Sequence, residues 1–126
     1  MDLNYKMISL LPNKKPTNNK YKAIKTKVNG ITFDSKREAA YYAELCFRKR
    51  AGEIVGEIEI QPKFPLRQGD FKFASRPFRA DFRFTEVRGN ELVTRIVDVK
   101  GVDTREGRLR RRIAEFIHNV TIEVIK

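Results

Sequence analysis

The sequence is poor in residues that carry much of protein chemistry. It has one cysteine, Cys46, and one histidine, His118, in 126 residues. A single cysteine excludes an intramolecular disulfide and any cysteine-based zinc site. A single histidine leaves little room for triad catalysis or for histidine-ligated metals. The groups that remain for catalysis are carboxylates, lysines, arginines and water.

Long hydrophobic runs are also missing. No segment approaches the roughly 18 apolar residues of a membrane-spanning helix. The apolar stretch from Met7 to Leu11 is too short for the core of a signal peptide, and no small-residue cleavage site follows it. We therefore expect a cytoplasmic protein without a membrane partner.

Acidic residues are few relative to basic ones. The chain has 16 Asp and Glu against 27 Lys and Arg, a net charge of +11. At this size, such an excess makes a polyanion the first partner to consider. The excess is concentrated in residues 1–27, with seven lysines against Asp2, and in residues 105–112, with five arginines against Glu106. We expect a nucleic acid; the alternative is the general solubility of a small basic protein.

The length predicts a single folded domain, preceded by an arm. Residues 1–21 are polar and basic and lack periodicity, which predicts a flexible arm. Residues 22–126 are expected to form the domain, with a short strand at Lys22 to Val28 that ends at the turn Asn29-Gly30.

Periodicity within the domain predicts an α/β fold with a mixed sheet, in the order helix, three or four strands, helix, strand. The first helix is expected over Ser35 to Arg50, with the stop at Ala51-Gly52. The second helix is expected from an Asp103 or Thr104 cap to about Ile117, with Ile113, Phe116 and Ile117 buried. The remaining segments are expected to be strands: 54–64, 78–84, 92–100 and 120–125.

Two aspartates stand out within these strands. Gly89-Asn90 is typical of a two-residue hairpin loop, which would pair Arg88 with Glu91. The same register places Asp81 opposite Asp98, with their Cβ atoms roughly 4.5–5.5 Å apart. Like charges opposed in this way are destabilising unless a positive group lies between them. A divalent cation would provide that charge, and Lys100 is expected on the same face two residues further on.

Phosphodiester hydrolysis needs these components: a metal ion that activates water, and a positive group beside the nucleophile. We expect Asp81 and Asp98 to be metal ligands, with the Val99 backbone carbonyl as an additional ligand. Lys100 would orient the attacking water. Oxygen ligands favour Mg²⁺ or Mn²⁺. The alternative is structural: Asp98 pairs with Lys100 at the surface, and Asp81 bonds to a neighbouring arginine.

Further residues have two interpretations each. Glu38 completes the pattern Ser35-x-x-Glu38 of a capping box, so local rules make it a helix cap. The arginines after the last metal-binding strand would contact phosphates or form a solvated helix face. They are Arg105, Arg108, Arg110, Arg111 and Arg112. Lys20, Lys22 and Lys25 would track phosphates, or lie in a segment without function.

The order of these features resembles the PD-(D/E)XK nuclease superfamily. Glu38 on a helix is followed by Asp81 in an Ala-Asp-Phe strand and then by Asp98-Val99-Lys100-Gly101. The chain is similar in particular to compact phage enzymes related to endonuclease I, the resolvase of branched DNA. The segments 30–39, 60–64 and 98–101 also resemble a family of phage and prophage proteins. The likeness runs from about Lys22 to Lys126.

The resemblance implies a restriction-endonuclease-like core, with a central mixed β-sheet flanked by helices in the order α-β-β-β-α-β. It implies a Mg²⁺-dependent DNA endonuclease that acts on branched DNA such as a Holliday junction, in recombination and in the host cytoplasm if the gene is phage-borne. A junction resolvase is expected to be a homodimer. Asp81, Asp98 and Lys100 keep their roles, Glu38 becomes an acidic residue near the metal, and Gln61 lies at the nucleic-acid-binding edge of the site.

Two positions depart from the family pattern. Asp98 stands where glutamate is commoner, and Ala80 stands where proline often precedes the aspartate. Two other functions stay open: a non-catalytic nucleic-acid-binding module on a degenerate nuclease fold, and a nuclease directed at RNA or single strands.

Overall fold

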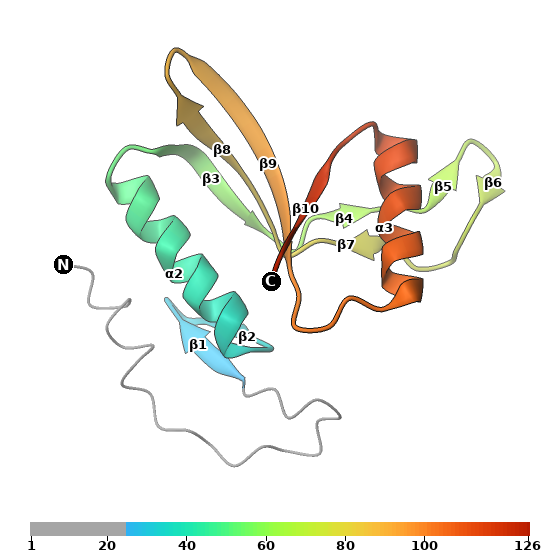
Figure 1. Cartoon of the computed structure of the whole chain (residues 1–126), viewed down its shortest axis with the longest axis horizontal. Coiled ribbons are helices and arrows are strands. Elements are labelled where there is room, and N and C mark those ends of the chain that lie inside the picture. Colours follow the sequence, from blue (N-terminus) through green and yellow to red (C-terminus); the bar gives the residue numbers. More distant parts are fainter. Residues whose placement is uncertain (1–24) are drawn as a thin grey trace. The chain divides into compact units, whose positions relative to one another are not determined.

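The computed structural model describes residues 25–126 (Figure 1). The chain divides into two compact units, with the boundary after Ile54. The predicted basic arm, residues 1–21, lies outside the described residues, and so does Lys22.

The first unit contains a hairpin and a helix. Strands β1 (Thr26–Val28) and β2 (Ile31–Phe33) pair antiparallel around Asn29-Gly30. Both loop residues have positive φ, as this hairpin turn requires, which confirms the predicted turn. Helix α2 (Lys36–Arg50) lies against both strands, with Ser35 as its N-cap, close to the predicted bounds (Figure 1).

The second unit is built on a four-stranded mixed sheet. Its order is β10 (Ile122–Ile125), β9 (Glu91–Val99), β8 (Phe82–Arg88) and β3 (Ile54–Ile60). β8 and β9 are antiparallel, whereas β9 and β10 are parallel. Helix α3 (Arg105–His118) connects the parallel pair, as such a connection requires. The predicted mixed α/β class is confirmed.

The predicted strands 54–64 and 78–84 are each interrupted, the first of them at Pro62, where proline predicts a break. β3 ends at Ile60, and β4 (Lys63–Phe64) begins after Gln61, which has a φ of 52°. β7 (Phe78–Arg79) is separated from β8 by two residues and pairs antiparallel with β4. Between them β5 (Arg67–Gln68) and β6 (Phe71–Lys72) form a small hairpin. The breaks bring the ends of four strands together around Asp81.

Helix α3 packs on the core through its smallest apolar side chain. Ala114 is fully buried, whereas Phe116 is 75% exposed, so the prediction of a buried stripe through Phe116 is wrong. Two residues along a helix turn almost to the opposite side, so contact through Ala114 directs Phe116 outward. The core cluster consists of Phe64, Leu66, Phe78, Ala80, Ile96, Ala114 and Ile122. No helix within residues 25–126 is long and apolar enough to cross a membrane.

Candidate functional site

Asp98 is the most unusual side chain of the second unit. It lies near the end of the central strand β9 and is 2% exposed. Ile96, two residues earlier on the same face, belongs to the core cluster. The Asp98 Oδ2 atom is buried and has no hydrogen-bond partner among the described residues. A carboxylate oxygen left in this state is costly, because burial removes its hydration.

Lys100 supplies the positive charge next to this oxygen. Its Nζ lies 3.3 Å from Asp98 Oδ2, close enough for an ion pair but not aligned as a hydrogen bond. The Lys100 backbone N–H donates to the Ile125 carbonyl at 2.9 Å, which fixes the start of the side chain beside β10. The prediction that Asp98 and Lys100 share one face of the strand is confirmed. The alternative of a surface pair is wrong, because Asp98 is buried.

Asp81 lies where β8 leaves the ladder with β9. The predicted register is confirmed from Arg88–Glu91 to Phe82–Val97, but Asp81 does not continue it. Its N–H donates to the Val97 carbonyl at 3.0 Å, so two successive residues face Val97, as in a β-bulge. The prediction of a directly opposed Asp81–Asp98 pair is therefore wrong, because the bulge ends the ladder one residue earlier.

The bulge gives the Asp81 carboxylate a new neighbour. Its Oδ2 accepts the Val99 backbone N–H at 2.6 Å, in place of a main-chain carbonyl of the ladder. The carboxylate is thereby fixed beside the residue that follows Asp98. In an extended strand, the carbonyl of a residue points to the same side as its N–H. The Val99 carbonyl is therefore directed toward the Asp81 side.

Gln61 is joined to Asp81 through the backbone. The Gln61 N–H donates to the Asp81 carbonyl at 2.9 Å, and Ala80 N–H donates to the Pro62 carbonyl at 3.2 Å. Pro62 has no N–H, so this position cannot complete a regular ladder. The structure thus brings Gln61, Asp81, Asp98 and Lys100 into one region, while contact between Gln61 and nucleic acid stays a prediction.

Glu38 belongs to the first unit, where it caps α2. The Ser35 Oγ atom accepts the Glu38 N–H at 3.2 Å. The Ser35 hydroxyl also donates to Glu38 Oε2 at 3.2 Å, so the carboxylate bonds to the cap side chain. The expected cap is confirmed, although the carboxylate does not bond to the cap backbone as in a full capping box. The assignment of Glu38 to a metal site stays a prediction.

The predicted metal ligands are oxygen donors. Among residues 25–126, no three or more His, Cys, Asp or Glu side chains gather closely enough to hold a metal ion. Asp98 and Asp81 offer two carboxylates, and one of the four oxygens is buried without a hydrogen bond. This donor set fits a hard divalent cation that keeps several waters.

The arginines of α3 divide into two groups. Arg111 is buried and donates to both carboxylate oxygens of Asp103, at 3.0 and 3.2 Å. Arg110 donates to the Arg76 and Pro77 carbonyls, and Arg108 donates to the Asp103 carbonyl. Burial and the pairing with Asp103 favour a structural role for Arg111, while phosphate contact by the α3 arginines stays a prediction. Arg105 and Arg112 are exposed on the helix, and Lys25 is exposed before β1, so these three stay available to phosphates.

The Asp103–Arg111 pair shifts both pKa values. Hydrogen bonding to Arg111 lowers the pKa of Asp103, helped by the charges of Arg111 and Arg108. Hydrogen bonding to Asp103 raises the pKa of Arg111, and the charge of Asp98 adds to the effect. The guanidinium is therefore a fixed positive charge in the field of Asp98.

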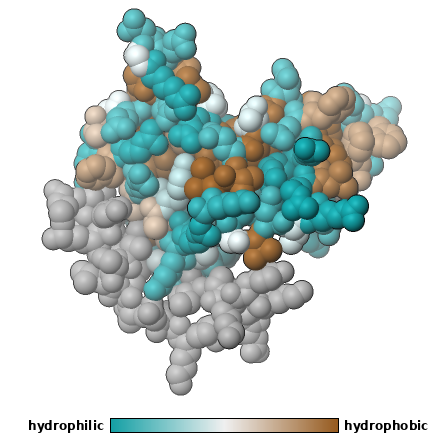
Figure 2. Space-filling model, in the orientation of Figure 1, coloured by the Kyte–Doolittle hydropathy of each residue, from teal (hydrophilic) through white to brown (hydrophobic). Residues whose placement is uncertain are grey.

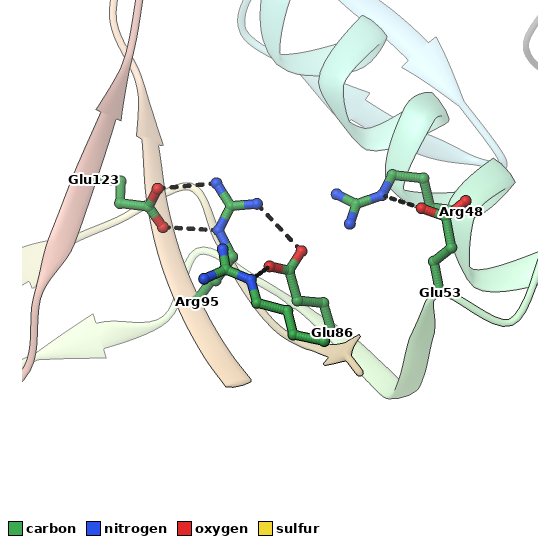
Figure 3. Close-up of polar contacts among 6 residues, drawn as sticks. Arg48, Glu53, Glu86, Arg95 and Glu123 are labelled. Carbon is green, nitrogen blue, oxygen red and sulfur yellow. Dashed lines mark hydrogen bonds and ion pairs between the residues drawn. The ribbon is translucent and has the colours of Figure 1, made fainter. Parts of the chain in front are cut away.

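A second ionic network lies on the face of the sheet opposite to Asp98, and it was not predicted from the sequence. Arg95 donates to both oxygens of Glu123 at 2.8 and 2.9 Å and to Glu86 at 3.3 Å (Figure 3). Arg88 also donates to Glu86. Arg95 hydrogen bonding lowers the pKa of Glu123. Residues three apart on a strand face opposite sides, so Arg95 lies on the other face from Asp98. The predicted pairing of β8 with β9 already placed Glu86 near Arg95, whereas Glu123 joins them only through the parallel pairing of β10 with β9.

Comparison with known proteins places the chain in a family. No curated protein and no solved structure matches it. One protein family matches residues 18–124, nearly the whole chain, and it is described as a protein of unknown function. The chain therefore belongs to the DUF1064 family.

Proposed function

We propose that this protein is a divalent-metal-dependent DNA endonuclease that hydrolyses phosphodiester bonds, with branched DNA as its substrate class. The proposal is carried by Asp98, whose Oδ2 atom is buried without a hydrogen bond and lies 3.3 Å from Lys100 Nζ. The Asp81 carboxylate, held on the Val99 N–H, adds a second acidic group next to it. The order of Glu38, Asp81, Asp98 and Lys100 along the chain supports the nuclease assignment by resemblance alone.

Each residue has a defined task in this proposal. Asp81 and Asp98 would hold the cation, with the Val99 carbonyl as a third oxygen, and the resemblance alone assigns Glu38 as a further acidic residue. Bound Mg²⁺ or Mn²⁺ would lower the pKa of a coordinated water and neutralise phosphate charge. Lys100 orients the attacking water, since its ammonium is the cation next to the buried oxygen. Arg105 and Arg112 contact the phosphates of the strand.

A non-catalytic nucleic-acid-binding module is the second candidate. It is favoured by one observation: both aspartates already have a protein partner, Lys100 for Asp98 and the Val99 N–H for Asp81. In that function the acidic groups would stabilise the strand ends, and the basic residues alone would bind nucleic acid.

An assay of cleavage on defined substrates distinguishes the endonuclease from the non-catalytic module. Purified protein is incubated with labelled four-way junction, duplex DNA, single-stranded DNA and RNA, with and without Mg²⁺ or Mn²⁺. The expected result is metal-dependent cleavage of the junction that Asp98→Asn lowers by roughly a hundredfold or more, because that variant removes a ligand charge. Glu38→Gln keeps an oxygen for the Ser35 hydroxyl and tests the helix acid separately.

The fold of the variants is followed by thermal unfolding. Asp98→Asn is expected to stay close to the wild type in stability without metal, because the loss of a desolvated charge offsets the loss of its ion pair with the partly exposed Lys100. Leu92→Ala, at an exposed position on β9, is the control. Absence of metal-dependent cleavage by the wild type on every substrate would favour the non-catalytic module. Equal cleavage by the wild type and Asp98→Asn would exclude Asp98 as a metal ligand.

A further inference from the structure

The β5–β6 hairpin projects from a firmly anchored base. Leu66, directly before β5, is 1% exposed and belongs to the core cluster. Its carbonyl accepts the N–H groups of Phe73 and Ala74, at 2.9 and 3.4 Å, so both ends of the hairpin are joined at the core. The two-residue loop contains Gly69 with a φ of 58°, which a tight hairpin needs. The hairpin is thus held in one orientation.

Two aromatic rings lie exposed on this hairpin. Phe71 is 63% exposed and Phe73 is 45% exposed. Residues two apart on an extended chain share a face, and the two rings meet edge to face with centroids 4.7 Å apart. Figure 2 shows hydrophobic colour at the end of the second unit where Figure 1 places β5 and β6. Exposing two phenylalanines on a rigid element is unfavourable unless a partner covers them.

The surroundings of these rings are basic. Within residues 63–79 the only acidic residue is Asp70. The same segment carries five exposed basic residues: Lys63, Arg67, Lys72, Arg76 and Arg79. A second copy of this chain would bring the same positive charges to a symmetric contact, and like charges oppose such an association. A polyanion with flat apolar groups fits both features.

We infer that the β5–β6 hairpin binds unpaired bases of DNA, with Phe71 and Phe73 stacking on the bases and the neighbouring lysines and arginines contacting phosphates. Aromatic rings within a positive surface are how proteins hold single strands, because every base offers a face to stack on. The inference rests on the proposed function for the choice of DNA, and it narrows the substrate to DNA with unpaired bases. It does not depend on hydrolysis.

Binding is tested without metal, so that cleavage plays no part. Fluorescence anisotropy measures the affinity of the full chain for a labelled 20-nucleotide oligothymidylate and for a duplex of the same length, in EDTA. The variant Phe71→Ala/Phe73→Ala is expected to bind the oligothymidylate roughly tenfold or more weakly, with a smaller change for the duplex. Lys72→Ala is expected to weaken both. Leu92→Ala, an exposed apolar residue on another hairpin, is the matched control and is expected to bind like the wild type.

Thermal unfolding confirms that each variant is folded, and sedimentation gives the oligomeric state. Unchanged oligothymidylate affinity in the double phenylalanine variant would overturn the inference, as would no binding by the wild type. A change of oligomeric state with unchanged DNA affinity would also overturn it, because the partner would then be a second copy of the chain. If the endonuclease proposal alone is wrong, metal-dependent cleavage is absent, but the double phenylalanine variant still binds the oligothymidylate more weakly than the wild type.

Discussion

Two buried acids of the sheet show why Asp98 differs from an ordinary structural carboxylate. Glu86 is 4% exposed, yet Arg88 and Arg95 both donate to its oxygens. Asp98 is 2% exposed, and its Oδ2 has the charge of Lys100 beside it but no hydrogen bond from any described residue. The same sheet can therefore provide full pairing to a buried acid. In the proposed endonuclease, a bound cation would supply at Asp98 the positive partner that the two arginines supply at Glu86.

Asp81 allows the structural and the chemical role of one residue to be separated. Asp81→Asn keeps a side-chain oxygen that accepts the Val99 N–H, so its free energy of unfolding is expected to stay within about 0.5 kcal/mol of the wild type. Asp81→Ala leaves that N–H without its partner and is expected to lose roughly 1–3 kcal/mol. Both variants are expected to lose metal-dependent cleavage. Urea unfolding and junction cleavage are the two measurements.

The comparison between the two Asp81 variants is decisive. If Asp81→Asn cleaves like the wild type, Asp81 serves the bulge alone and is not a metal ligand. If Asp81→Ala is as stable as Asp81→Asn, the bond to Val99 is not what holds the strand end.

At the scale of elements, local signals predicted what local forces determine. The Asn29-Gly30 and Gly89-Asn90 turns, the Ser35 and Thr104 caps and the register of β8 with β9 all follow from adjacent residues. The predicted register was wrong at Asp81, where the backbone of Gln61 and Pro62, about twenty residues earlier in the sequence, bonds to this segment. The predicted buried face of α3 was wrong for the same reason, because core residues far away in the sequence decide which side of the helix is buried. The approach of Lys100 to Asp98 was predictable because Lys100 follows Asp98 by two residues, directly after the end of β9.

The start of α3 depends on an ion pair that is expected to give it a pH dependence. The pKa of Asp103 is lowered in the folded protein, chiefly by hydrogen bonding to Arg111. The folded state then binds the proton less tightly than the unfolded state, so the pair stabilises the fold above the unfolded pKa of roughly 3.9. This contribution is lost as pH falls through the lower folded pKa. Asp103→Asn should lower the melting temperature at pH 7, with a smaller difference from the wild type near pH 3.

Circular dichroism melts from pH 7 to pH 3 measure this difference. Asp70→Asn, in the exposed β5–β6 loop, is the matched control and is expected to melt like the wild type at pH 7. A melting difference for Asp103→Asn that is constant over the whole pH range would show that the carboxylate charge does not contribute.

At the scale of the whole molecule, the charge of +11 is divided between residues that hold the fold and residues that remain exposed. Arg95 and Arg111 are committed to carboxylates inside the second unit. Arg105 and Arg112 are exposed at the surface of α3. Net charge alone therefore overstates the number of groups that can contact phosphates, and the salt dependence of DNA binding measures the number that do.

Each phosphate neutralised by a lysine or arginine releases counterions, which steepens the fall of affinity with salt. The double variant Arg105→Ala/Arg112→Ala is expected to lower the slope of log K against log salt by about 0.7–0.9 for each phosphate that is no longer neutralised. Its melting temperature should stay near that of the wild type, because both side chains are exposed. Anisotropy titrations in EDTA from low to moderate salt give the slope, and Lys126→Ala provides an exposed charge deletion outside α3. An unchanged slope in the double variant, or an equal decrease in Lys126→Ala, would show that the arginines of α3 do not contact phosphates and that DNA is held elsewhere on the basic surface.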